Sequence, residues 1–174
     1  MNVPDLATRV SRRCLLVDWG DTVMRVFPEQ SGPMFRWPRV EAIPGAEEAL
    51  GRLGGPRGSW RIALATNAAD SDEADIRKAL ARVGLDGLFE RIYCFARVGH
   101  KKPSAEFFGY VLEDLKLPCT SVVMVGDEFE RDVLGANACG IRGVWLNRIT
   151  SEVREGAMYQ TARDWEQVAE LLGA

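Results

Sequence analysis

Short apolar runs that alternate with longer amphipathic stretches constrain the fold of this 174-residue chain more than any other feature. This alternation is typical of βαβ units and therefore of a parallel sheet. Several runs are apolar almost throughout, which predicts strands that are buried on both faces. The expected strands are Cys14–Val17, Arg61–Ala65, Arg91–Phe95, Ser121–Val125 and Gly143–Leu146.

Helical periodicity fills the intervals between these strands. In the clearest case, apolar residues from Phe108 to Leu115 recur at i, i+3, i+4 and i+7 after a start signal at Ser104. Asp70 and Glu73 have the spacing of a capping box, which predicts another helix start nearby. The expected helices are Ala46–Leu53, Ser71–Val83, Ser104–Leu115, Glu130–Cys139 and Ala162–Leu172.

Residues 23–43 fit this scheme least well, because they are rich in turn residues and contain Trp37-Pro38. We expect a loop or hairpin excursion over the mouth of the sheet, where an active site would lie, and a single domain over residues 1–174. Four aromatic residues in or near this segment either form an apolar rim or pack in the ordinary way: Trp19, Phe27, Phe35 and Trp37.

Composition excludes several classes of protein. The 22 basic and 25 acidic residues include no basic block, so nucleic acid is not expected as a main partner. The apolar stretches are far shorter than the roughly 20 residues that span a bilayer, so no membrane is expected either. The polar N-terminus, Met1–Arg13, lacks the features of a secretory signal, and we expect a cytoplasmic protein.

The cysteine and histidine content narrows the chemistry further. Cys14, Cys94, Cys119 and Cys139 form no C-x-x-C pair, which favours free thiols over disulfides or zinc ligands. His100 is the sole histidine, so any nucleophile that needs an imidazole would depend on this residue.

Polar residues follow the expected strands at the sheet edge where ligands of parallel sheets bind. They are Asp18-Trp19-Gly20-Asp21-Thr22, Thr66-Asn67, Gly126-Asp127 with Asp132, and Lys101-Lys102-Pro103 before the long helix. Carboxylates gathered at one edge repel one another unless a hard cation such as Mg²⁺ lies between them, and a lysine would pair with a carboxylate or a bound phosphate. Singly, each residue is more typical of a cap, a turn or a solvated loop than of a site, whereas their joint order favours a site.

In this order the motifs resemble those of the haloacid dehalogenase superfamily of aspartate-nucleophile phosphohydrolases, over about residues 14–146. The family's four motifs are similar to Leu15–Thr22, Leu64–Asn67, Lys102-Pro103 and Gly126–Asp132. The resemblance implies an α/β, three-layer Rossmann-like fold with a central parallel sheet and helices on both faces. No cap domain is expected, because core elements fill the intervals between the motifs.

The resemblance also implies residue roles. Asp18 would attack phosphorus and form an aspartyl-phosphate intermediate. Thr66, Asn67 and Lys102 would bind the phosphoryl oxygens, and Lys102 would also stabilise the charge of Asp18. A Mg²⁺ ion would be held by Asp18, the backbone carbonyl of Gly20, Asp127 and Asp132.

Gly20 departs from the family pattern, in which an aspartate at this position protonates the leaving oxygen. Such acid–base help is worth about 10²–10⁴-fold in rate. Asp21 is a candidate surrogate if the loop is shifted. We therefore expect a Mg²⁺-dependent phosphohydrolase whose activity is weak or depends on the leaving group. The alternatives are a catalytically impaired binding or regulatory protein on the same scaffold, and metal-independent dehalogenation through Asp18.

The expected absence of a cap has consequences for partners. An open site implies either a large phosphorylated substrate or closure by a partner subunit, so a homo-oligomer is left open. The sequence does not identify the substrate.

Overall fold

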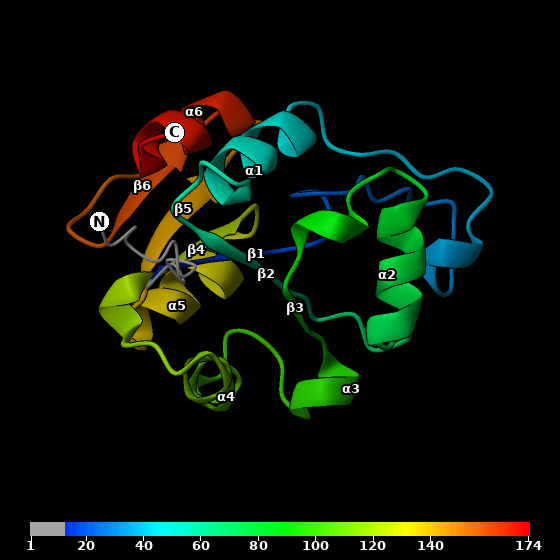
Figure 1. The fold of residues 1–174 in the computed structure, drawn as a ribbon, viewed down its shortest axis with the longest axis horizontal. Coiled ribbons are helices and arrows are strands. Elements are labelled where there is room, and N and C mark those ends of the chain that lie inside the picture. The colour runs from blue at the N-terminus through cyan, green and yellow to red at the C-terminus, as the bar shows by residue number, and fades with distance from the viewer. Residues whose placement is uncertain (1–12) are drawn as a thin grey trace, which may run out of the picture.

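The structure, a computed structural model, describes residues 13–174 and is built around a parallel sheet. Within these residues six strands pair in the order β3-β2-β1-β4-β5-β6, all parallel (Figure 1). The strands are β1 (Cys14–Val17), β2 (Arg61–Ala65), β3 (Arg91–Tyr93), β4 (Val122–Gly126), β5 (Arg142–Leu146) and β6 (Tyr159–Ala162). The strand order reverses between β1 and β4, which opens a crevice at their carboxyl ends.

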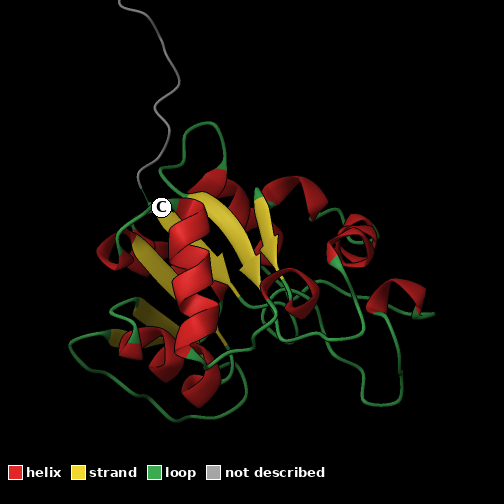
Figure 2. Cartoon of the chain, turned by 90° about the horizontal axis from the view of Figure 1, so that it is seen from below, coloured by secondary structure: helices red, strands yellow, loops and turns green. Residues whose placement is uncertain are grey.

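Helices cover both faces of the sheet, as the views in Figures 1 and 2 show. Because side chains alternate along a strand, Leu15 and Val17 face one layer while Cys14 and Leu16 face the other. The first layer contains α1 (Ala46–Gly54), α2 (Glu73–Ala81) and α6 (Trp165–Leu172), and the second contains α3 (Phe95–Val98), α4 (Ala105–Leu115) and α5 (Gly135–Ala138). The predicted three-layer Rossmann-like fold is confirmed.

The remaining helical turns are short. Three are 3₁₀-helices, η1 (Met34–Arg36), η2 (Asp86–Leu88) and η3 (Cys119–Ser121), and one is a π-helix, η4 (Phe129–Leu134). The expected helix 130–139 is present as an unbroken helical run, but its first part is the π-helix η4 and only its second part is the α-helix α5.

Several predicted ends need correction. The capping box at Asp70 is wrong, because Asp72 caps α2 by accepting the N–H of Asp75 at 2.9 Å. β3 ends early because Cys94 becomes the residue before α3. Residue 162 ends β6 and does not begin the last helix, since Asp164 is the residue that caps α6. β6 itself was not expected, because its residues Tyr159–Ala162 are polar and mostly half-buried.

Residues 23–43 form an anchored segment beside α2 (Figure 1). Met24 pairs with Ala42 in an antiparallel bridge near the two ends of the segment. Arg82, at the end of α2, donates to the backbone carbonyls of Trp37 and Pro38 and to that of Phe35. These bonds hold the segment in one place next to the carboxyl ends of the strands.

The described residues, 13–174, also bear on the cysteines and on membrane-spanning helices. All four cysteines are free, as predicted. No helix in this range is long and apolar enough to cross a membrane. The expectation about Met1–Arg13 lies outside the described residues except at Arg13, and a single domain over 1–174 stays a prediction.

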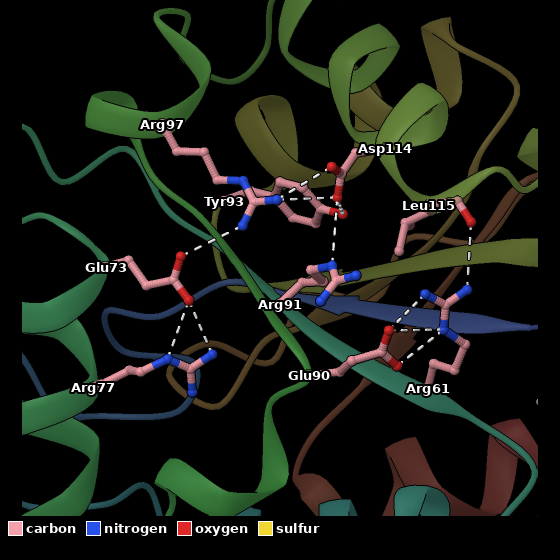
Figure 3. Close-up of polar contacts among 9 residues, drawn as sticks. All are labelled: Arg61, Glu73, Arg77, Glu90, Arg91, Tyr93, Arg97, Asp114 and Leu115. Carbon is pink, nitrogen blue, oxygen red and sulfur yellow. Dashed lines mark hydrogen bonds and ion pairs between the residues drawn. The ribbon is translucent and has the colours of Figure 1, made fainter.

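A network of charged groups ties helices together across the edge strand β3 (Figure 3). The buried Tyr93 of β3 donates its hydroxyl to Asp114 of α4 at 2.8 Å. Asp114 also pairs with Arg97 of α3, which reaches Glu73 of α2. Burial and the bond to Asp114 raise the pKa of Tyr93, so the hydroxyl stays a donor.

Replacing Tyr93→Phe tests this network. The variant loses a buried hydrogen bond to a charged group, and we expect unfolding free energy to fall by about 1.5–3 kcal/mol in urea titrations. The matched control, Arg91→Gln, removes an exposed partner 3.6 Å from the same carboxylate and should cost less than about 1 kcal/mol. Equal losses in the two variants would contradict a special role for the buried bond.

Candidate active site

The polar residues expected at the strand ends meet at one edge of the sheet. Asp18 follows β1, Thr66 follows β2 and Asp127 follows β4, and all three line a cavity of about 430 Å³. Lys102, from the loop before α4, and Asp132, from η4, lie buried beside them. The crevice between β1 and β4 therefore holds the candidate site.

The side chain of Lys102 joins two of the carboxylates. Its Nζ donates to Asp18 Oδ1 and to Asp132 Oδ1, at 2.7 Å each, and the side chain is only 1% exposed. Burial lowers the pKa of Lys102, but the charges of Asp18 and Asp132 outweigh this effect and the net pKa is raised. The ammonium group therefore keeps its charge at neutral pH.

Asn67 holds the backbone of Lys102. Its Nδ2 donates to the Lys102 carbonyl at 2.9 Å, and its Oδ1 accepts the Lys102 N–H at 2.8 Å. Both ends of the amide are thus used, so a direct bond from this side chain to phosphate stays a prediction. The Thr66 hydroxyl accepts the N–H of Ala68 at 3.1 Å and keeps its own proton available for a phosphoryl oxygen.

Thr22 is a site residue to which the sequence analysis gave no role. Its buried Oγ1 lies 3.1 Å from both Asp18 Oδ2 and Asp127 Oδ1, and it accepts the Asp127 N–H at 3.2 Å. Trp165 of α6 donates to the Thr22 carbonyl at 2.8 Å. The available signal was its place as the last residue of the first motif.

The π-helix η4 delivers Asp132 to the site, and such helices are frequent at functional sites. Asp132 Oδ2 accepts the Glu128 N–H at 3.1 Å, while Oδ1 contacts Lys102. The carboxylate lies directly against Gly126, where a Cβ atom would come within 2.1 Å of Oδ2. Only glycine at this position leaves room for the contact.

A Gly126→Ala substitution should therefore displace Asp132 from Lys102. We expect lower stability, because the buried ammonium loses a partner, and weaker Mg²⁺ binding by calorimetry. Gly109→Ala is the matched control: position 109 is exposed on α4 with nothing within 4 Å of a new Cβ. That change should stabilise the protein by about 0.5–1 kcal/mol, and the same sign in both variants would contradict the account.

The carboxylate cluster fits a divalent cation. Asp18, Asp127 and Asp132 each offer one oxygen, and these atoms lie within 4.8 Å of one another. Burial, followed by the charges of Asp18 and Asp132, raises the pKa of Asp127 to about 7, although the Thr22 bond acts in the opposite direction. Lys102 compensates one charge only, so an oxygen-rich excess of negative charge remains, which is the environment that hard cations prefer.

An Asp127→Asn variant tests the electrostatic cost of this burial and repulsion. Because the carboxyl pKa is higher in the folded chain than its ordinary value near 4, Asp127 favours folding at low pH and this contribution is lost as pH rises through about 7. Without metal, the melting temperature of the variant should exceed that of the wild type. The difference should grow as the pH rises from about 4 to about 7.

Mg²⁺ should reverse the order of stability, raising the melting temperature of the wild type and not that of the variant. Glu130→Gln, which changes a carboxylate that is 78% exposed, is the control. A margin that does not vary with pH would contradict the assigned repulsion.

Gly20 and Asp21 lie in the loop after Asp18 and both line the cavity. A Cβ atom at Gly20 would come within 2.9 Å of Val26 Cγ2, so Val26 fills the space beside the glycine. Asp21 has a left-handed backbone, with φ 54°, and its Oδ1 accepts the Val26 N–H at 3.0 Å. A metal bond from the Gly20 carbonyl stays a prediction.

Of the four aromatic residues expected either to form an apolar rim or to pack in the ordinary way, two reach the cavity and two do not. Trp19 and Trp37 line the cavity and are also largely buried in the core. Phe27 is buried in the core and Phe35 packs against it, so these two serve packing.

Comparison with known proteins agrees with the motifs and the fold. A family model of haloacid dehalogenase-like hydrolases matches residues 13–140. The chain belongs to this family. A solved structure of an uncharacterized protein from Listeria monocytogenes serotype 4b superposes on this haloacid dehalogenase-like protein with a TM-score of 0.80. The two are 28% identical, and the match covers 92% of this chain and 96% of that one.

Two curated relatives are named as a nucleotidase and a phosphatase. The pyrimidine 5'-nucleotidase YjjG of Escherichia coli is 35% identical over 115 residues, which is 66% of this chain and 48% of the relative. The phosphoserine phosphatase of Thermus thermophilus is 31% identical over 110 residues, covering 63% and 42%. The chain thus spans about half the length of these curated relatives.

Proposed function

We propose that the protein is a Mg²⁺-dependent phosphohydrolase that acts through an aspartyl-phosphate on Asp18. The observation that carries this proposal is the 2.7 Å contact between Lys102 Nζ and Asp18 Oδ1 at the edge of the cavity. A buried cation beside a cavity-lining carboxylate can both orient that carboxylate and attract a phosphate. The names of the two curated relatives, a nucleotidase and a phosphoserine phosphatase, support a phosphorylated substrate.

Asp18 is held for attack by two neighbours. Lys102 fixes Oδ1 and Thr22 lies 3.1 Å from Oδ2, so little reorientation is needed when a phosphoryl group arrives. In the first step Asp18 forms a bond to phosphorus while the bond from phosphorus to the leaving oxygen breaks. In the second step water attacks the same phosphorus atom, which releases inorganic phosphate and restores the carboxylate.

The attacking carboxylate and the phosphate repel each other, and the site contains groups that reduce this cost. The Lys102 ammonium and the Thr66 hydroxyl would stabilise the negative charge that spreads over the phosphoryl oxygens. Mg²⁺, when bound by Asp18, Asp127 and Asp132, would supply further charge neutralisation. Because no cap domain is expected, we also propose that the site is covered in one of two ways: by a large phosphorylated substrate, or by a second copy of the chain.

Asp18→Asn tests the proposal. Wild-type protein should hydrolyse 4-nitrophenyl phosphate with Mg²⁺, and the variant should fall to the background rate because the amide cannot act as the nucleophile. Asp72→Asn is the matched control, since it removes one carboxylate far from the chemistry and asparagine also caps helices. Activity retained in Asp18→Asn would contradict the mechanism, and Mg²⁺ and phosphate binding without turnover in the wild type would favour a regulatory protein.

A further inference from the structure

Part of the active-site cavity has an apolar wall. Trp19, Val26, Met34 and Trp37 line it, three of them from the 23–43 segment. Trp19 donates its indole N–H to Met24 Sδ at 3.2 Å, and Trp37 donates to the carbonyls of residues 31 and 32. Because both N–H groups are used, the two rings offer only apolar surface to a ligand.

This apolar wall is preformed. Arg82 holds the segment from α2 through three carbonyl groups, and the bridge between Met24 and Ala42 joins its two ends. A cavity of about 430 Å³ is large enough for a phosphoryl group together with a ring. Binding of an apolar ring would therefore need little rearrangement of the protein.

The cavity-lining acids decide whether the protein can protonate the leaving oxygen. A departing oxygen must either receive a proton from an acid or be a weak base itself. Among residues 13–174, the cavity-lining carboxyl groups are those of Asp18, Asp21, Asp70, Asp127 and Glu128. Asp18 and Asp127 are assigned to attack and to metal binding, Glu128 pairs with an arginine at 2.7 Å, and Asp70 accepts a serine hydroxyl at 3.1 Å.

Asp21 is committed to the turn that it begins. Its N–H donates to the Met24 carbonyl at 2.7 Å, its carbonyl accepts from Arg148 at 3.0 Å, and its Oδ1 accepts the Val26 N–H at 3.0 Å. Beside it Gly20 has no side chain, and the methyl groups of Val26 fill the adjacent space. Hydrocarbon and not a carboxyl group therefore lies beside Gly20, in the loop that follows the attacking residue.

We propose that the site is selective for aryl phosphates, the phosphate monoesters of phenols. The proposal rests on the proposed phosphohydrolase function and names its substrate class. Asp18 attacks phosphorus, and the electron pair of the breaking bond leaves on a phenolate oxygen, which takes its proton from water afterwards. The apolar wall binds the ring, and the ring in turn stabilises the leaving charge that the protein does not protonate.

The experiment compares leaving groups at constant ring size. Values of kcat/KM are measured with Mg²⁺ for 4-nitrophenyl, phenyl and 4-methoxyphenyl phosphate, and for benzyl phosphate, which has the same ring but leaves as an alkoxide. We expect kcat/KM to fall steeply as the pKa of the phenol rises. Benzyl phosphate should react about 10²–10⁴-fold more slowly than phenyl phosphate, because acid help of that size is missing.

Variants extend the test to the residues. Gly20→Asp combined with Val26→Ala makes room for a carboxyl group and should speed benzyl phosphate most, whereas Val26→Ala alone should not. Asp21→Asn should leave the leaving-group dependence unchanged, since the amide oxygen can still accept the Val26 N–H. Retention of the wild-type melting temperature shows that each variant is folded.

The outcomes separate the two levels of the argument. A shallow leaving-group dependence in the wild type would overturn the aryl phosphate assignment. If that dependence became steep in Asp21→Asn, Asp21 would be the group that supplies the proton. No Mg²⁺-dependent turnover of any phosphate ester would instead overturn the proposed phosphohydrolase function.

Discussion

The buried ammonium group of Lys102 is the interaction on which the site depends. A charge that is removed from water costs several kcal/mol unless partners compensate it, and here Asp18 and Asp132 provide that compensation at 2.7 Å. Conversely, the ammonium allows two carboxylates to approach each other at the end of a parallel sheet. Asn67 fixes the lysine backbone and Gly126 leaves room for Asp132, so the residues around this contact are also constrained by it.

The same cluster is electrostatically unbalanced without a cation. Three carboxylates gather beside one ammonium group, and burial together with the charges of Asp18 and Asp132 raises the pKa of Asp127. The two hydrophobic layers around the sheet offset this cost, since most residues of β1 to β5 are buried against helices. An active site commonly lowers the stability of the folded protein, because its residues are selected for function.

Much of this arrangement could be predicted from the sequence, because it depends on local apolar runs and the residues that end them. The bounds of β1 and β2 follow from such runs, and the order of the polar strand ends indicates which side chains meet. β6 could not be found in this way, since an edge strand with polar side chains shows no apolar run. The π-helix η4 could not be found either, because its apolar pattern does not differ from that of an α-helix start.

Other features required long-range contacts that no local pattern reports. The pairing of Asn67 with the Lys102 backbone joins residues 35 positions apart. Similarly, Val26 fills the space beside Gly20 only because the 23–43 segment folds back along the cavity.

Chemical trapping of the intermediate tests the central claim most directly. Wild-type protein is quenched during turnover of 4-nitrophenyl phosphate with Mg²⁺, treated with borohydride and mapped by peptide mass spectrometry. The account predicts that Asp18 is reduced to homoserine, because only a phosphorylated carboxyl group is reactive enough. Reduction at Asp21 or Asp127, or turnover with no reduced residue, would contradict it.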